Sequence, residues 1–263
     1  MRRRSNDSFW MWGVAVVAVL IVAGIALYYG QRERGFTPDE PVAALPEPAA
    51  TPPPARTPAE PQADTGERAL PLPPLDESDA DVQSGLTELV GNDAVAEFLV
   101  PERIVRNLVV TIDNLPREQA TVQQRPIKPT PGAFMTEGTE DAPVLSPDNY
   151  ERYEPFISIV ENVDAKTLVS MYRGLQPLFQ QAYEDLGHPN AFFTTRLLEV
   201  IDHLLQTPTP SGAIRLVQPS VQYRYADERL EKLSAGQKLL LRMGPENAEA
   251  IKTKLREIQA ELS

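Results

Sequence analysis

An uninterrupted apolar run near the N-terminus constrains this chain more than any other feature. Residues 9–29 read FWMWGVAVVAVLIVAGIALYY and carry no charged side chain. As a helix that rises about 1.5 Å per residue, this run spans roughly 30 Å, the thickness of the hydrocarbon core of a bilayer. Aromatic residues stand at both of its ends, where amphipathic rings meet the lipid head groups. The sequence therefore predicts a single transmembrane helix at 9–29, with the lipid bilayer as the first partner of the chain.

The charges that flank the run predict its orientation. Arg2, Arg3 and Arg4 precede it, whereas Arg32 and Arg34 follow it with Glu33 between them. Because positive charge is retained in the cytoplasm, residues 1–8 are predicted to form a cytoplasmic tail, and the rest of the chain is expected to be exported. A cleaved signal peptide is the alternative, with a small-x-small site that ends at Ala26. The apolar run continues past that site to Tyr29, which favours an uncleaved signal-anchor.

Proline dominates the segment after the apolar run. Between residues 36 and 74, 12 of 39 positions are proline. Proline lacks the amide donor and fixes φ, so neither helix nor sheet propagates through such a stretch. Residues 30–74 are therefore predicted to be a disordered, Pro-rich linker with polyproline II character. The more specific alternative is that a PxxP motif in this stretch binds a partner domain. Any Pro-rich segment contains prolines at that spacing by composition alone, so a spacer is favoured.

Helical periodicity prevails in residues 75–263, which are predicted to form one mainly α globular domain with a minor β element. Caps and apolar spacing predict helices over 78–90, 101–115, 164–186, 197–205, 234–243 and 245–262, and a shorter helical turn after Ser146. In the last of these helices, Lys252 and Lys254 are expected to face outward. Alternation of apolar residues predicts two short strands, or one bent strand, between residues 214 and 225.

Charge and composition exclude several classes of function. The chain has a net charge of -12 and no cysteine. From residue 75 onward there are 18 Lys and Arg against 29 Asp and Glu, a difference of -11. An acidic domain repels phosphate backbones, so nucleic acid is not expected as a partner. The missing cysteines exclude disulfides, thiolate nucleophiles and thiolate metal sites.

Candidate chemistry in the domain is sparse. The sequence has only two histidines, His188 and His203, and no P-loop, G-x-S-x-G or dinucleotide fingerprint, so no catalytic residue and no cofactor are predicted. Glu199 and His203 are four residues apart and share a helix face, which makes them weak candidates for holding a metal. An ion pair on a solvated helix face is the favoured interpretation of that pair. Aromatic residues concentrate between positions 150 and 225, either as core or as a groove for a partner.

A long irregular segment offers the second set of candidates. Residues 116–147 carry several prolines and glycines and no helical period, and loops of this length are usually functional or disordered. Arg125 and Lys128 make its first half basic, and Ile127 and Phe134 are expected to dock on the helical core. Its part from 136 to 142 is expected to be a loose acidic loop. Either the segment is a structural strap or it binds a partner, with Arg125, Lys128, Phe134, Tyr150 and Tyr153 as the candidate contacts.

Several strings in the domain also resemble a known family. They are RPIKPTPGAF, LSPDNYERYEPF, LVSMYRGLQPLFQQAYEDLG, FFTTRLLEVIDHLL and SAGQKLLLRMG. They resemble an uncharacterised family of proteobacterial proteins, each with an N-terminal membrane anchor and a domain of unknown function. The resemblance implies a single-pass protein of the bacterial inner membrane with its domain in the periplasm. It carries no activity and no catalytic residues.

Two functions from different classes follow from these observations. The layout of anchor, spacer and domain without a catalytic set favours a tethered interaction or scaffold module, which binds an envelope protein or a cell-wall component. The alternative is an envelope hydrolase that uses carboxylates and a metal at His203.

Overall fold

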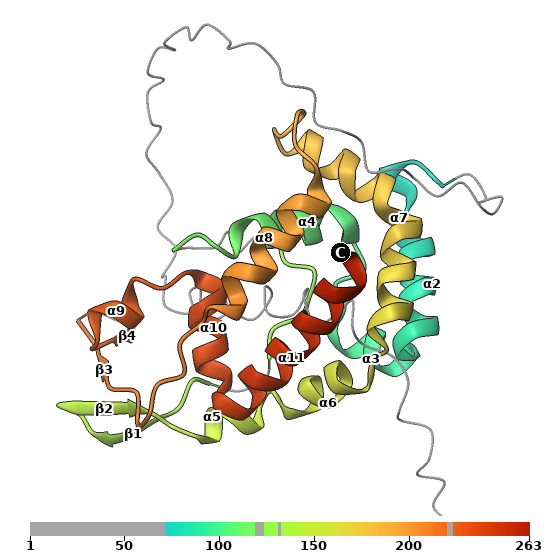
Figure 1. The fold of residues 1–263 in the computed structure, drawn as a ribbon. Helices are drawn as coiled ribbons and strands as arrows, with labels where there is room; N and C mark the ends of the chain where they lie inside the picture. The colour runs from blue at the N-terminus through green and yellow to red at the C-terminus, as the bar shows by residue number, and fades with distance from the viewer. Residues whose placement is uncertain (1–71, 119–123, 131–132, 220–222) are drawn as a thin grey trace, which may run out of the picture.

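The computed structural model describes residues 72–118, 124–130, 133–219 and 223–263, and these form a mainly helical domain with two small antiparallel sheets. The predicted tail, span and most of the linker lie outside the described residues. Figure 1 shows the helices packed side by side and the strands together at one end. The elements are η1 (Leu75–Glu77), α2 (Asp79–Val90), α3 (Asn92–Phe98), α4 (Ile104–Asn114), β1 (Thr136–Thr139), β2 (Ala142–Leu145), α5 (Asp148–Glu151), α6 (Glu154–Asn162), α7 (Ala165–Asp185), α8 (Phe193–Leu205), β3 (Leu216–Val217), β4 (Arg224–Tyr225), α9 (Glu228–Glu231), α10 (Ala235–Met243) and α11 (Pro245–Leu262).

The C-terminal helix α11 lies at the centre of the bundle and packs against α6, α7, α8 and α10. Its apolar residues Ile251, Leu255 and Ile258 are buried, as their spacing predicts. The prediction for Lys252 and Lys254 is wrong, because both residues are buried, each with 6% exposure. Their ammonium groups donate to carbonyls that follow two other helices: Lys252 to the Thr207 oxygen at 2.7 Å and Lys254 to the Val163 oxygen at 2.6 Å. A cation is favourable at a helix C-terminus, so both lysines fasten α11 to its neighbours.

Helix α4 starts later than its sequence suggests. The sequence predicts a helix from Pro101, but Arg103 takes a left-handed conformation with φ 49° and α4 begins at Ile104. The carboxylate of Asp79 in α2 accepts the backbone N–H groups of Arg103 and Ile104, both at 2.7 Å. The N-terminus of α4 is therefore capped by a residue from another helix, and not by its own preceding residues.

A β-rich end forms a second, smaller core. Strands β1 and β2 make a hairpin, and β2 also meets the segment that leads into β3 through the Val144–Arg215 bridge. The prediction of a loose acidic loop over 136–142 is wrong, because these residues form β1, the turn after it and the first residue of β2. The residues of β1 have little strand propensity. The hairpin forms because β2 also pairs with the segment around Arg215. The prediction of strands between 214 and 225 is confirmed as β3 and β4.

The first half of the irregular segment lies along the helices. Ile127 is 2% exposed and bridges to Leu99, and its neighbours exchange backbone hydrogen bonds with Phe98 and Val100. The expected docking of Ile127 is confirmed. Within the described part of the chain, no helix has both the length and the apolar character needed to cross a bilayer.

Candidate functional site: a cleft at the β-rich end

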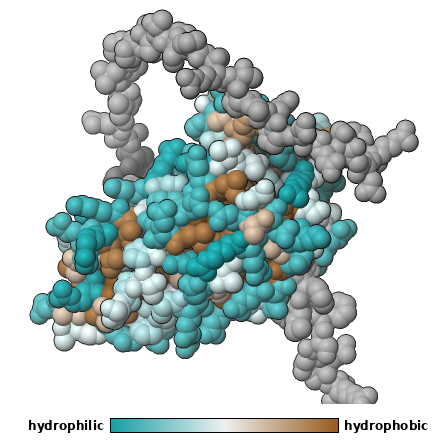
Figure 2. Space-filling model, in the orientation of Figure 1, coloured by the Kyte–Doolittle hydropathy of each residue, from teal (hydrophilic) through white to brown (hydrophobic). Residues whose placement is uncertain are grey.

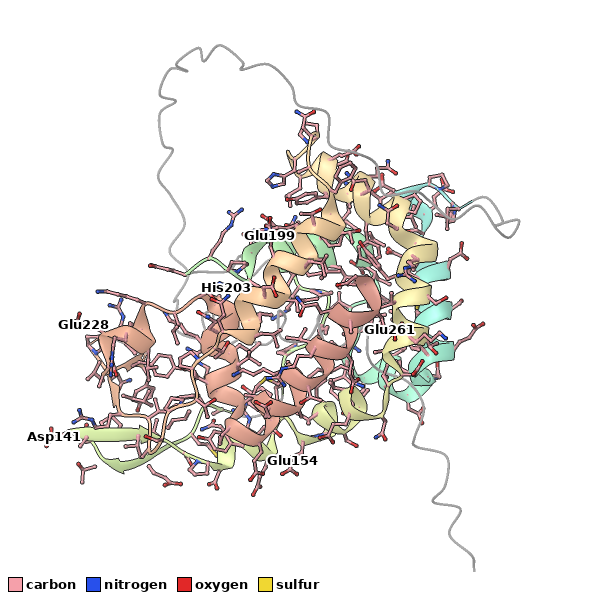
Figure 3. The ribbon with its side chains drawn as sticks, viewed as in Figure 1. Asp141, Glu154, Glu199, His203, Glu228 and Glu261 are labelled. Atoms are coloured by element: carbon pink, nitrogen blue, oxygen red, sulfur yellow. The ribbon has the colours of Figure 1, made fainter. Side chains whose placement is uncertain are left out.

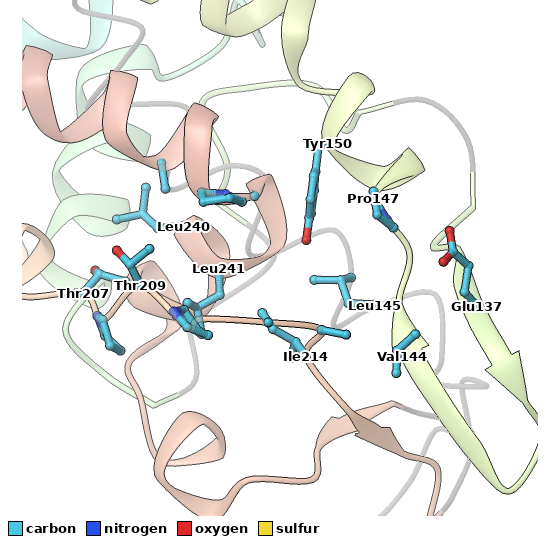
Figure 4. A pocket seen from close by; sticks show the side chains of 17 residues that line it. Glu137, Val144, Leu145, Pro147, Tyr150, Thr207, Thr209, Ile214, Leu240 and Leu241 are labelled. Atoms are coloured by element: carbon cyan, nitrogen blue, oxygen red, sulfur yellow. The ribbon is translucent and has the colours of Figure 1, made fainter.

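A cleft of about 380 Å³ opens where the β1–β2 hairpin faces helix α10 and the start of α11. Figure 4 shows Glu137 on the hairpin at one end and Thr207 and Thr209 at the other. Most of the lining is aliphatic or proline, and Glu137 is its one charged residue. The lining residues are Glu137, Val144, Leu145, Pro147, Tyr150, Thr207, Pro208, Thr209, Pro210, Gly212, Ala213, Ile214, Leu240, Leu241, Gly244, Pro245 and Ala248. A mostly apolar hollow with a few polar groups is typical of a ligand site.

Tyr150 is held rigidly in the wall of this cleft. Its ring lies so close to Gly244 that a Cβ added there would come within 2.5–2.8 Å of three ring carbons. Gly244 also has φ 87°, which glycine adopts readily and other residues rarely do. The side-chain amide of Asn247 donates to the Tyr150 carbonyl at 3.0 Å. Glycine at position 244 therefore both ends α10 and lets the tyrosine ring pack flat against the backbone.

The carboxylate of Glu137 is oriented by a buried hydroxyl. Ser146, only 1% exposed, donates from Oγ to Glu137 Oε1 at 2.7 Å. Burial, and second the negative charge of Glu137, raise the pKa of Tyr150. The tyrosine is therefore neutral at pH 7 and offers an O–H donor inside the cleft. This end of the cleft combines a fixed anion with a phenol.

The opposite wall is a loop, residues 207–214, that is anchored at its start. Thr207 accepts the Lys252 ammonium at its carbonyl and donates its own hydroxyl to the Leu204 carbonyl at 2.6 Å. Further along, the backbone N–H groups of Thr209, Ser211, Gly212 and Ala213 donate no hydrogen bond to any part of the chain that the structure describes. The loop is thus fixed at its base, while its outer backbone remains available to another molecule.

The metal candidates Glu199 and His203 lie on α8, away from this cleft (Figure 3). His203 Nε2 lies 2.9 Å from Ser234 Oγ, and Ser234 caps α10 by accepting the Gln237 N–H at 3.2 Å. Glu199 contacts Arg196 at 3.3 Å. Among the described residues, no group of three His, Asp or Glu side chains is placed to share a metal ion. Both candidates have protein partners of their own.

The same geometry restricts what Ser234 and His203 can do chemically. The backbone N–H groups that follow Ser234 are occupied: Ala235 donates to the Arg117 carbonyl at 2.7 Å and Gly236 to the Leu115 carbonyl at 3.0 Å. They are the donors that a helix N-terminus would otherwise direct at an oxyanion. In this conformation, Ser234 acts as a helix cap and His203 as its hydrogen-bonded neighbour.

The lowered pKa of His203 leads us to expect that the stability of the domain depends on pH. Burial, and second the charge of Arg196, lower the pKa of His203 from its usual 6.5. As pH falls through 6.5, the unfolded chain takes up a proton at this position before the folded chain does, so stability falls with pH. We expect the difference in Tm between the native chain and His203→Gln to shrink or reverse on acidification from pH 7. A difference that is constant across this window, measured by thermal unfolding, would contradict the prediction.

The partner-binding candidates are spread over the molecule. Tyr150 lines the cleft, whereas Tyr153 is a core residue with 1% exposure. The expected docking of Phe134 on the helical core is wrong, because Phe134 is half-buried in the second core instead, with its ring 5.8 Å from that of Tyr223. Lys128 is exposed, and its ammonium donates to the Ala96 carbonyl at 2.6 Å, while Arg125 is half-buried. Of the five candidates, only Tyr150 lies in the cleft.

Comparison with known proteins identifies the family of the domain. A family model described as "Protein of unknown function (DUF3014)" matches residues 104–259, more than half of the chain. The chain belongs to this family. The matched DUF3014 segment contains every residue that lines the cleft. Neither the curated proteins nor the solved structures contain a match to the chain.

Most of the cleft cannot be recognised in the amino-acid sequence. Its lining comes from four separate stretches, around residues 137–150, 207–214, 240–241 and 244–248. The stretch TPTPSGAI, at 207–214, gave a signal, because two prolines and a glycine between a helix and a strand indicate an irregular exposed segment. Its position opposite Glu137 depends on the hairpin, which the sequence did not predict.

Proposed function

We propose that this chain is a membrane-anchored interaction module of the bacterial envelope, and that its DUF3014 domain holds a partner in the cleft. The observation that carries the proposal is the cleft itself, a rigid apolar hollow with a carboxylate and a phenol at one end. The uncharged run at 9–29 and the Pro-rich stretch after it support a tethered arrangement, in which the domain searches a volume near the membrane. The arginines before the run support a periplasmic location for the domain.

The alternative function, an envelope hydrolase with a metal at His203, has weaker support. Both candidate metal ligands already contact another side chain. Glu199 contacts Arg196, and His203 contacts Ser234. The cleft itself offers one carboxylate, Glu137, and a carboxylate pair is what glycoside hydrolysis ordinarily uses.

In-cell photo-crosslinking tests the proposed function. A photoreactive residue is placed at Ala213, in the cleft, and in a matched variant at Gly174, where an added Cβ meets nothing within 4 Å. We expect the Ala213 variant to capture a discrete envelope protein, identified by mass spectrometry, and the Gly174 variant not to capture it. Equal capture from both positions would refute the cleft as the binding site. Capture of cytoplasmic proteins alone would reverse the orientation, and a product of the chain with itself would make the partner a second copy.

A further inference from the structure

The chemistry of the cleft points to one class of ligand, and this inference rests on the proposed function. At about 380 Å³, the cleft is near the lower end of the range for ligand pockets, about 300–1,000 Å³. It has room for one or two apolar side chains of a partner, but not for a helix or a folded domain. Leu145, Ile214 and Leu241 belong to the small second core and form the apolar centre of the cleft. A projecting segment of a partner fits this shape.

The only charge in the lining of the cleft is negative. Glu137 is the charged residue of the lining, and its carboxylate is held in place by Ser146. Exposed acidic residues also follow the lining in sequence, namely Glu140 and Asp141 at the hairpin tip, Asp148 after Pro147 and Glu246 after Pro245. Figure 3 shows Asp141 at the outer end of the hairpin. A ligand with a positive charge beside its apolar part complements this surface.

The two arginines nearest to the lining in sequence do not neutralise the negative charge of Glu137 within the cleft. Arg242 follows Leu241 and is hydrogen bonded to the buried Tyr225. Arg215 follows Ile214 and is exposed, while Ile214 is buried, as expected where neighbouring side chains of an extended segment point to opposite sides. Neither residue lines the cleft. The anionic end of the cleft is therefore left for a cation from outside.

The backbone of the 207–214 loop supports an extended ligand. Thr209, Ser211, Gly212 and Ala213 present N–H groups that have no acceptor within the described residues. A peptide in extended conformation carries carbonyls at regular spacing, and a partner strand gains affinity from such main-chain hydrogen bonds, while pockets for its side chains give specificity. A folded-back or helical ligand satisfies its own carbonyls and gains nothing from these donors.

We propose that the cleft binds an extended segment of a partner protein, which places an apolar side chain between Leu145, Ile214 and Leu241 and a lysine or arginine against Glu137. The Tyr150 hydroxyl lies inside the cleft with these groups (Figure 4) and is a further donor for the main chain of the ligand. The ligand is recognised by an apolar contact with one ion pair beside it. Hydrogen bonds from the backbone of the 207–214 loop set the position of the ligand along the cleft.

Selection from a displayed library of random short peptides on the full-length protein in detergent tests this assignment. We expect the enriched peptides to share a lysine or arginine next to apolar residues. Glu137→Lys should weaken their binding about tenfold or more, because it replaces attraction by repulsion at the only charged residue of the lining. Glu140→Lys makes the same charge change on the same hairpin outside the cleft and should change binding by less than about threefold. Ala213→Trp, which fills the cleft, should abolish binding.

Several results would overturn the assignment. These are a failure to enrich any peptide, enrichment of acidic or uncharged peptides, and binding that Glu137→Lys or Ala213→Trp leaves unchanged. The in-cell crosslink separates this failure from that of the proposed function. If the Ala213 probe captures an envelope protein while the selected peptides lack a basic residue, the module stands and the ligand class is wrong. If the Ala213 probe captures nothing, the module itself fails.

Discussion

Replacing Phe193 by alanine is expected to lower the free energy of unfolding by about 4 kcal/mol, a large fraction of the stability of a typical domain. Phe193 is 1% exposed and opens α8. Its ring stacks on that of Phe179 at 5.5 Å and lies 5.6 Å from Tyr183 and 6.5 Å from Tyr172. Truncation removes a large buried surface and these ring contacts together, and the rigid helices α7 and α8 cannot close the cavity.

The adjacent residue provides the control. Phe192 is 36% exposed and stands just before the helix, so Phe192→Ala should cost less than about 1 kcal/mol. Denaturant unfolding of the native chain and the two variants in the same detergent measures both changes. Similar losses for Phe192 and Phe193 would mean that this aromatic cluster is not the packed core that the structure shows.

Elements whose signals are local are predictable from the sequence. The predicted cap of the long helix, Asp164, accepts the Thr167 N–H at 2.7 Å at the start of α7. The predicted cap of α10, Ser234, forms a full capping box with Gln237. In both cases, the group that caps the helix lies within three residues of the group that it satisfies, so the chemistry is visible in a short window.

Features that depend on distant partners are not predictable in this way. Asp79 caps a helix that begins 25 residues later, and the hairpin at 136–145 is supported by the strand segment around Arg215. Lys252 and Lys254 are predicted to face solvent because lysine is rarely buried, yet each reaches a carbonyl at the end of another helix. The cleft fails to appear in the sequence for the same reason, since its walls come from stretches that only the fold brings together.

The surface shows why composition alone did not locate the cleft. Figure 2 shows hydrophilic residues over much of the visible face, with hydrophobic residues gathered along α8 and toward the β-rich end. Exposed apolar atoms are common on globular proteins, and single exposed residues carry no information about function. Enclosure and the placement of Glu137 distinguish the cleft from the rest of this surface, and both are properties of the fold.

The second large loss of stability is expected at a buried ion pair between α4 and α8. The side chain of Asp113 is 4% exposed, and its Oδ1 accepts from Arg196 Nε at 2.9 Å. A second guanidinium nitrogen of Arg196 donates to the backbone carbonyl of the same residue at 2.9 Å. Arg117 reaches Oδ2 at 2.8 Å, but its own side chain is 60% exposed. Arg196 is therefore the partner that compensates the buried carboxylate and joins the two helices.

Replacing Arg196 by leucine is accordingly expected to cost about 3 kcal/mol, because it leaves the desolvated carboxylate with two exposed partners, Arg117 at 2.8 Å and the more distant His188 ring at 3.9 Å. Arg117→Leu should cost less than about 1 kcal/mol, as exposed ion pairs do. Adding Asp113→Asn to Arg196→Leu should recover part of the loss, since it removes the uncompensated charge and keeps the shape of the side chain. Unfolding of these three variants and of Asp113→Asn alone, each against the native chain, measures the coupling between positions 113 and 196. If Arg117→Leu proves the costlier change, or if Asp113→Asn deepens the loss, the carboxylate is compensated from the surface and Arg196 is not the clamp between α4 and α8.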